Sequence, residues 1–133
     1  MKAARIVAIV VMAYVGIVVV FESMIGYFQP ADGSTLVITT FDGDDIPHDR
    51  VVSGIEATGN LYVATNHWIR GWYNRALEKP DVRVTLNGKT SEYRAVPVAG
   101  AEHDRLVRES SLGVALRILT GFPPRYFVRL DPR

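Results

Sequence analysis

The chain has 133 residues, a formal net charge of +1 and no cysteine, which allows one domain and excludes disulfides, thiolate metal sites and a cysteine nucleophile. Outside the first 29 residues the chain carries 13 basic and 13 acidic side chains. A neutral domain lacks the basic surface that nucleic-acid binding requires, so nucleic acid is excluded as a partner.

Residues 1–29 predict a transmembrane anchor. The run from Ile6 to Phe21 has no charged residue, and the apolar character continues through Phe28. About 23 residues make roughly 34 Å of helix, enough to cross a hydrocarbon core of about 30 Å. The alternative is a cleaved signal peptide, but no small-x-small cleavage site follows Phe21, so we expect the helix to be retained.

The flanking charges favour one orientation of this single-pass anchor in the cell membrane. Lys2 and Arg5 precede the apolar run, and acidic residues dominate the stretch that follows it. The positive-inside rule then favours a cytoplasmic N-terminus and an outward-facing domain.

Residues 30–133 predict one α+β domain, mainly antiparallel β, after a linker at 29–34. Short alternating runs predict strands, and Thr58-Gly59-Asn60 and Asn87-Gly88 are typical of tight hairpin turns. Longer apolar periodicity predicts two helices, the first ended by Pro80 and the second by Gly121. The expected strands are 36–41, 51–57, 61–65, 82–86, 90–98 and 125–130, and the expected helices are 68–79 and 101–120. Hairpin connections favour a small barrel with helical cover.

The acidic loop 42–49 and the three histidines are candidates for metal binding. Four aspartates and His48 fall within this loop, but their spacing differs from the known calcium loop, so we expect a solvated turn. His48, His67 and His103 are too far apart in sequence to show metal-ligand spacing. We therefore predict no metal.

The junction between the third strand and the first helix gathers residues that could bind a ligand. Two indoles, a guanidinium and an imidazole there could line a site for a flat aromatic molecule. The alternative is that Trp72 and Tyr73 are core aromatics that close one end of the barrel. The candidate residues are Asn66, His67, Trp68, Arg70, Trp72 and Tyr73.

From about Leu36 to Leu130 the chain resembles the deazaflavin-dependent nitroreductase and quinone reductase family. Its most specific part is a Trp-Tyr helix followed by a Pro-x-Val strand. The segments that carry the resemblance are Asp49–Val52, Leu61–Ala64, Trp72–Leu77 with Pro80–Val82, Tyr93–Val98, Glu102–Arg105 and Thr120–Arg125. The resemblance implies a six-stranded split β-barrel with two helices, preceded here by the transmembrane helix.

The resemblance also implies a chemistry. Reduced deazaflavin (coenzyme F-420) would donate a hydride to a quinone-like or nitro-aromatic acceptor. Arg50 matches an arginine after the family's phosphate loop, Asn66 matches the strand end at the cofactor, and Arg70 would stand near the cofactor tail. Trp72 and Tyr73 match positions beside the ring system. Where the family has a basic phosphate loop, this chain has the acidic loop 42–49, whose carboxylates would repel phosphate.

Two hypotheses follow, from different classes of protein. The first is a membrane-anchored oxidoreductase that reduces or binds quinone. The second is a non-catalytic accessory subunit of a larger membrane complex, such as a respiratory enzyme, with the helix as its docking element. The expected partners are therefore membrane lipid, together with a quinone, a larger complex or a second copy of the chain.

Overall fold

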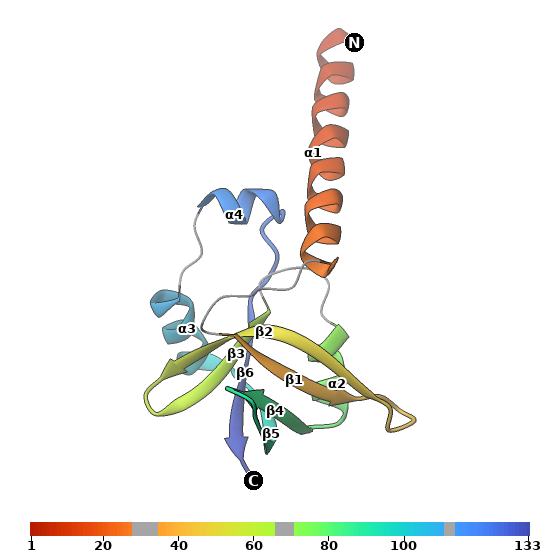
Figure 1. Ribbon diagram of the computed structural model, residues 1–133. Coiled ribbons are helices and arrows are strands. Elements are labelled where there is room, and N and C mark those ends of the chain that lie inside the picture. The colour runs from red at the N-terminus through yellow and green to blue at the C-terminus, as the bar shows by residue number, and fades with distance from the viewer. Residues whose placement is uncertain (28–34, 66–70, 111–113) are drawn as a thin grey trace.

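The N-terminal helix α1 stands apart from a small barrel. A computed structural model describes residues 1–27, 35–65, 71–110 and 114–133. Helix α1 spans Lys2–Tyr27, and its Lys2–Met24 stretch has a mean hydropathy of 2.6, with almost all of its side chains exposed. It projects away from the barrel (Figure 1). One N-terminal helix is thus long and apolar enough to cross a membrane.

Six antiparallel strands close into a barrel, which confirms the predicted split β-barrel fold. Neighbouring strands pair in the order β1-β2-β3-β6-β5-β4, with β4 returning to β1. The bounds are β1 Thr35–Phe41, β2 Pro47–Ala57, β3 Asn60–Thr65, β4 Asp81–Leu86, β5 Lys89–Pro97 and β6 Tyr126–Pro132. Closure pairs each of these six strands on both sides, so none of them forms a sheet edge.

Local turn chemistry sets the register of two hairpins. Asn87 and Gly88 have φ of 52° and 79°, the conformation of a two-residue type I′ turn. Thr58 and Gly59 adopt the same pattern, with φ of 50° and 77°. In β1 the side chains of Leu36, Ile38 and Thr40 are buried in alternation, so the pleat directs them into the barrel.

Two helices cover the barrel and divide the core in two. Helix α2, Gly71–Glu78, packs on β1 and adds three buried residues to the core inside the barrel. Helix α3, Gly100–Glu109, packs on the outside of the sheet, where Leu106 joins Tyr62 and Phe127 in a second cluster.

The predicted helix 101–120 is wrong, because two shorter helices, α3 and α4 (Val114–Leu119), occupy this segment. Helix α3 ends at Ser110, whose φ and ψ of −124° and 47° leave the helical region. The Ser110 hydroxyl donates to the carbonyl oxygen of Leu106 at 2.5 Å, and the Ser110 N–H donates to the same oxygen at 2.9 Å. Such back-bonding by serine slightly destabilises a helix. Helix α4 has no buried residue, so its apolar side chains do not join the core.

The acidic loop is shorter than predicted. Strand β2 already begins at Pro47, so His48 and Asp49 lie in a strand opposite Thr40 and Thr39. Pairing with β1 places these residues in a strand despite their polar character. The first residues of the predicted helix 68–79 lie outside the described residues; its remainder corresponds to α2.

Candidate functional site

Trp72 and Tyr73 lie in the core at the end of the barrel that α2 closes. Trp72 is 4 % exposed and Tyr73 9 %, and both belong to the cluster inside the barrel. Their rings meet edge to face, with centroids 5.9 Å apart and planes at 89°. Trp72 presents almost no surface to a ligand, so in this arrangement it supports neighbouring side chains rather than stacking on a bound ring.

Among the residues that the structure describes, Tyr126 at the start of β6 offers accessible aromatic surface at this end of the barrel. Its ring lies 5.5 Å from that of Tyr73 and is tilted by 33°, and its side chain is 37 % exposed. The backbone N–H of Tyr126 donates to Oγ1 of Thr65 at 3.2 Å, which fixes this strand end opposite β3. We call Tyr73 and Tyr126 the tyrosine pair. The sequence analysis did not identify Tyr126, because no local sequence pattern indicates that β3 pairs with β6.

Two arginines lie towards the same end of the barrel. Arg50 is half-buried on β2 directly opposite Ile38, and opposed residues in antiparallel strands share a face, so it faces the interior with Ile38. On α2, Nε of Arg75 donates to Oγ1 of the fully buried Thr40 at 3.0 Å. The predicted residues Arg50, Trp72 and Tyr73 therefore all belong to the β1–β2–α2 side of the barrel. Asn66, His67, Trp68 and Arg70 lie outside the described residues.

The acidic loop is organised by Asp42. Its Oδ1 accepts the N–H groups of Asp44 at 2.9 Å and Ile46 at 3.0 Å, and its Oδ2 lies 2.8 Å from Nε2 of His48. The hydrogen bond to His48 is the main cause that lowers the pKa of Asp42. These bonds describe a self-contained turn. Within the described residues no group of three His, Asp or Glu side chains is placed to hold a metal ion.

An open cavity of about 510 Å³ lies beside this loop, and its walls are net negative. Four carboxylates and two cations line it, a formal charge of −2, and Lys79 is already ion-paired with Asp45. The charged lining residues are Asp45, Glu78, Asp81, Glu92, Lys79 and Arg83. The residues here do not fit the phosphorylated, polyanionic tail of a deazaflavin, because carboxylates would repel it.

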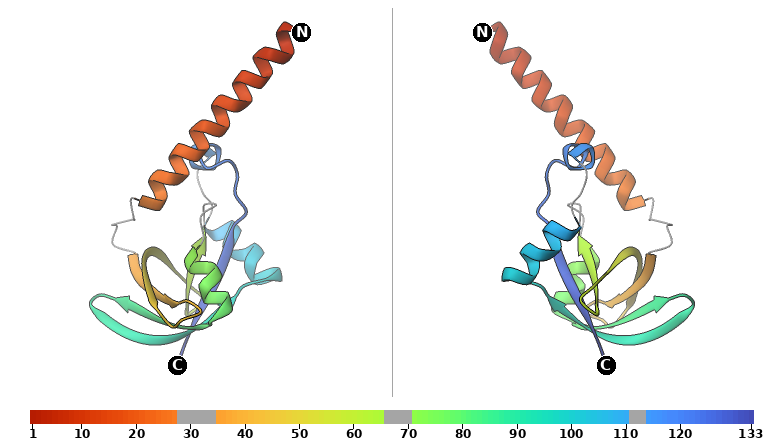
Figure 2. Two further views of the ribbon diagram at one scale, coloured as in Figure 1. Left: turned by 90° about the vertical axis from the view of Figure 1, so that its right-hand side faces the viewer. Right: turned by 90° about the vertical axis from the view of Figure 1, so that its left-hand side faces the viewer.

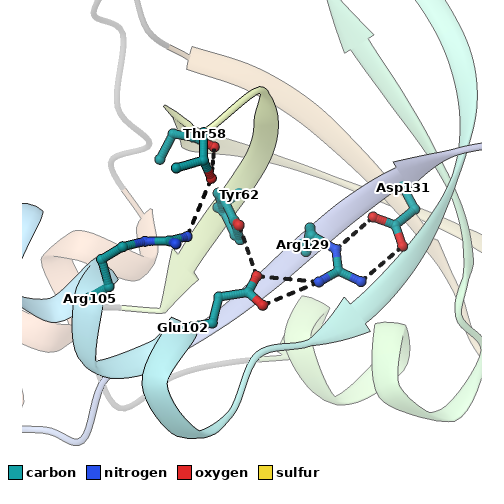
Figure 3. Close-up of polar contacts among 7 residues, drawn as sticks. Thr58, Tyr62, Glu102, Arg105, Arg129 and Asp131 are labelled. Carbon is teal, nitrogen blue, oxygen red and sulfur yellow. Dashed lines mark hydrogen bonds and ion pairs between the residues drawn. The ribbon is translucent and has the colours of Figure 1, made fainter.

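A second polar site lies between α3 and the β3–β6 ladder (Figure 3). The Tyr62 hydroxyl donates to Oε1 of Glu102 at 2.8 Å, and Nη1 of Arg129 lies 3.3 Å from both carboxylate oxygens of Glu102. Arg129 also donates to Asp131, from Nε at 2.7 Å and from Nη2 at 3.2 Å. The hydrogen bond to Asp131 is the main cause that raises the pKa of Arg129, so this guanidinium is permanently charged.

Further arginines make the adjoining cleft, of about 440 Å³, positive. Arg105, Arg108 and Arg129 line it together with the single carboxylate of Glu102, a formal charge of +2. Nη2 of Arg105 donates to Oγ1 of Thr58 at 3.3 Å, and Thr58 holds a positive φ that a β-branched residue rarely adopts. Sequence reasoning did not identify this cleft, because three separate segments assemble it.

Solved structures share this fold at low sequence identity. An F420-H2 dependent reductase, FDR-A, matches with a TM-score of 0.56 and 15 % identity over 78 % of this chain and 99 % of its own. The heme storage protein HutZ from Vibrio cholerae matches with a TM-score of 0.54 and 15 % identity, over 77 % and 83 % of the two chains. General Stress Protein 26 from Bacillus anthracis matches with a TM-score of 0.54 and 20 % identity, over 84 % and 86 %.

Neither a protein-family model nor a curated protein sequence matches the chain. The three proteins are named for different roles, and one fold commonly supports several functions, so the shared fold does not assign a function to this chain. The chain has the split β-barrel fold of an F420-H2 dependent reductase and of the related structures above.

Proposed function

We propose that this chain is a membrane-anchored oxidoreductase of the split-barrel class, which binds a planar, quinone-like or nitro-aromatic acceptor at the tyrosine pair. The observation that carries the proposal is the half-exposed ring of Tyr126, which rests on the buried ring of Tyr73 at an end of the barrel. Offset or tilted aromatic surfaces of this kind favour flat, electron-poor ligands.

The surroundings of the tyrosine pair support this proposal. The interior-facing Arg50 provides a positive charge on the neighbouring strands, which would stabilise negative charge that develops on a reduced quinone or nitro group. The apolar surface of α1 would hold the barrel at the membrane, where quinones partition.

A reduced deazaflavin or flavin would supply the hydride when bound, as the shared fold with an F420-H2 dependent reductase suggests. The role of this chain would be to orient the rings and to exclude water. Because the acidic end disfavours a polyanionic tail, flavin mononucleotide belongs in the same test as deazaflavin. A deazaflavin donor would also require a cytoplasmic barrel, opposite to the orientation that the flanking charges favour.

The test is an anaerobic titration of the full-length chain in mild detergent, with tryptophan fluorescence as the signal. Reduced deazaflavin, flavin mononucleotide and a short-chain benzoquinone would be titrated separately. We expect saturable binding of the quinone and of at least one ring cofactor. Tyr126→Ala should weaken binding by about tenfold, the equivalent of about 1.4 kcal/mol, whereas Tyr126→Phe should keep it.

Phe41→Ala is the matched control, because Phe41 is an aromatic residue on the cavity with negative walls. We expect this variant to bind like the wild type. Equal affinity of Tyr126→Ala and wild type would overturn the proposal, and loss of binding only in Phe41→Ala would move the site to the other cavity.

The competing function is that of an accessory subunit in a larger membrane complex. The negative cavity beside the acidic loop favours it, since carboxylates there would repel the phosphate that the resemblance to the reductase family implies at this loop. In that case the full-length chain would bind none of the three ligands and would co-purify in constant ratio with other subunits in mild detergent. Binding of a ring cofactor by the isolated chain would argue against it.

A further inference from the structure

Helix α4 and the residue that follows its C-terminal turn carry an exposed apolar surface. Val114 is 68 % exposed, Ile118 44 %, Leu119 38 % and Phe122 54 %, and no residue of α4 is buried. A six-residue helix without a buried face gains no stability from packing on its own domain and is marginal in water. Large apolar side chains gathered on such a segment indicate a non-aqueous partner.

The helix that contacts α4 is itself apolar and exposed. The hydroxyl of Tyr14 in α1 donates to the carbonyl oxygen of Ile118 at 2.9 Å, and α4 lies beside α1 rather than on the barrel (Figures 1 and 2). Side chains of α1 next to Tyr14, such as Val11 and Val15, are each more than half exposed. The exposed apolar surface of α4 is therefore continuous with that of α1.

Three carbonyl oxygens at the C-terminal end of α4 accept hydrogen bonds from protein donors. Carbonyl oxygens of a last helical turn have no partner within the helix. Here that of Leu116 accepts the N–H and the hydroxyl of Thr120, that of Arg117 accepts the N–H of Phe122, and that of Ile118 accepts the N–H of Gly121 and the Tyr14 hydroxyl. Protein donors at these three carbonyls are what a segment in hydrocarbon needs, since lipid offers none.

The depth of the contact follows from the helix geometry. Tyr14 lies eight residues before the buried Glu22, which is about 12 Å along the axis of α1. If Glu22 marks the membrane interface, α4 lies within the hydrocarbon layer. The single charge of α4, Arg117, lies with its guanidinium 5.6 Å from the Phe122 ring, a cation–π contact that partly compensates the charge.

We propose that α4 and Phe122 insert into the lipid bilayer beside α1 and form a second membrane element. This inference rests on the membrane anchoring in the proposed function. Tyr126 follows Phe122 by four residues, so insertion would hold the start of β6, and with it the tyrosine pair, against the membrane surface. A lipid-soluble acceptor could then reach Tyr126 without crossing water.

The test uses single-cysteine variants, because the chain has no native cysteine to compete for the label. Val11→Cys in α1, Ile118→Cys and Val114→Cys in α4, and Lys89→Cys on the exposed β4–β5 turn would each carry an environment-sensitive fluorophore. The full-length protein would be reconstituted in phosphatidylcholine vesicles containing a lipid with a nitroxide on its acyl chain. Circular dichroism of each labelled variant confirms that it is folded.

We expect strong quenching at Val11→Cys and at both α4 positions, and little at Lys89→Cys. Quenching at Val11→Cys with none at Ile118→Cys and Val114→Cys would overturn the inference, while still supporting α1 as the membrane anchor. A protein partner that covers α4 would give this result. If Val11→Cys is not quenched either, the anchor and the second element both fail. If Ile118→Cys does not fold, the quenching at Val114→Cys alone tests the insertion of α4. Val114 is the more exposed of the two side chains, so its replacement disturbs the fold less.

Discussion

The hydroxyl of Tyr62 on β3 donates a hydrogen bond of 2.8 Å to Glu102 on α3, a residue 40 positions later in the chain. The same carboxylate contacts Arg129 on β6, so one side chain joins α3 to two neighbouring strands (Figure 3). Helix α3 is therefore held on the barrel by a polar bridge as well as by its buried Leu106.

Replacing Glu102 should destabilise the fold. Glu102→Ala leaves the hydroxyl of the buried Tyr62 and one side of Arg129 without an acceptor, which should lower the free energy of unfolding by about 1–3 kcal/mol. Asp104→Ala is the control in the same helix, because the side chain of Asp104 is 70 % exposed. Within the described residues, its only ion pair is with His103. Urea unfolding in detergent at neutral pH measures the free energy of unfolding of both variants. Equal effects of the two substitutions would show that the bridge contributes nothing.

The ion pair between Arg129 and Asp131 should make stability depend on acidity. The hydrogen bond from Arg129 lowers the pKa of Asp131 below its ordinary value of 3.8. The folded chain then binds this proton less readily than the unfolded chain, so the contribution is present above that value and is lost as the pH falls through the lowered pKa.

Asp131→Asn should therefore lower the free energy of unfolding by about 1 kcal/mol or less at neutral pH, because both partners are partly exposed. The difference from wild type should shrink as the pH falls below 3.8 and through the lowered pKa of Asp131. Unfolding midpoints of the variant and the wild type across this pH range measure the difference in stability, with Asp44→Asn in the exposed turn as the control. A difference that stays constant with pH would contradict this account of the pair.

The interface between α2 and the barrel should resist added volume. Ala76 is fully buried in the core, whereas its neighbour Leu77 is 43 % exposed. Ala76→Leu should cost about 1–3 kcal/mol, because a close-packed core cannot admit a larger side chain without strain. Leu77→Ala should change stability by about 0.5 kcal/mol or less. Thermal unfolding compares the two variants, and a neutral Ala76→Leu would mean that α2 is not packed on the barrel as described.

The two type I′ turns offer a reciprocal pair of substitutions. Thr58 and Asn87 occupy the same turn position with φ of 50° and 52°, a conformation that asparagine tolerates and that strains a β-branched residue. Thr58→Asn should raise stability by about 0.5–1 kcal/mol, and Asn87→Thr should lower it by a similar amount. The melting temperatures of both variants test this. If both shift in the same direction, backbone strain is not the cause.

Features that depend on neighbouring residues could be read from the sequence. The Asn87-Gly88 turn follows from the positive φ that these two residues accept, and the strands around it follow from apolar alternation. The length and hydropathy of α1 required no tertiary information either. The positions of Trp72 and Tyr73 on a helix at the barrel end followed from a local motif.

Features that depend on distant pairing could not be read in this way. Helix α3 ends at Ser110, where the backbone leaves the helical region, although the apolar periodicity of the sequence continues across that point. Tyr126 became part of the candidate site only because β6 pairs with β3 and brings it to Tyr73. The cleft around Arg105 required α3 to lie against the Thr58 turn.

By itself the sequence determined the apolar N-terminal helix, the six strands and their hairpins, because hydrophobic periodicity and turn conformation act within a few residues. The tertiary structure decided which side chains meet: Glu102 with Tyr62 and Arg129, Tyr126 with Tyr73, and Tyr14 with Ile118. These contacts span up to 104 positions along the chain. Their partners are chosen by barrel closure and by packing, which no local pattern records.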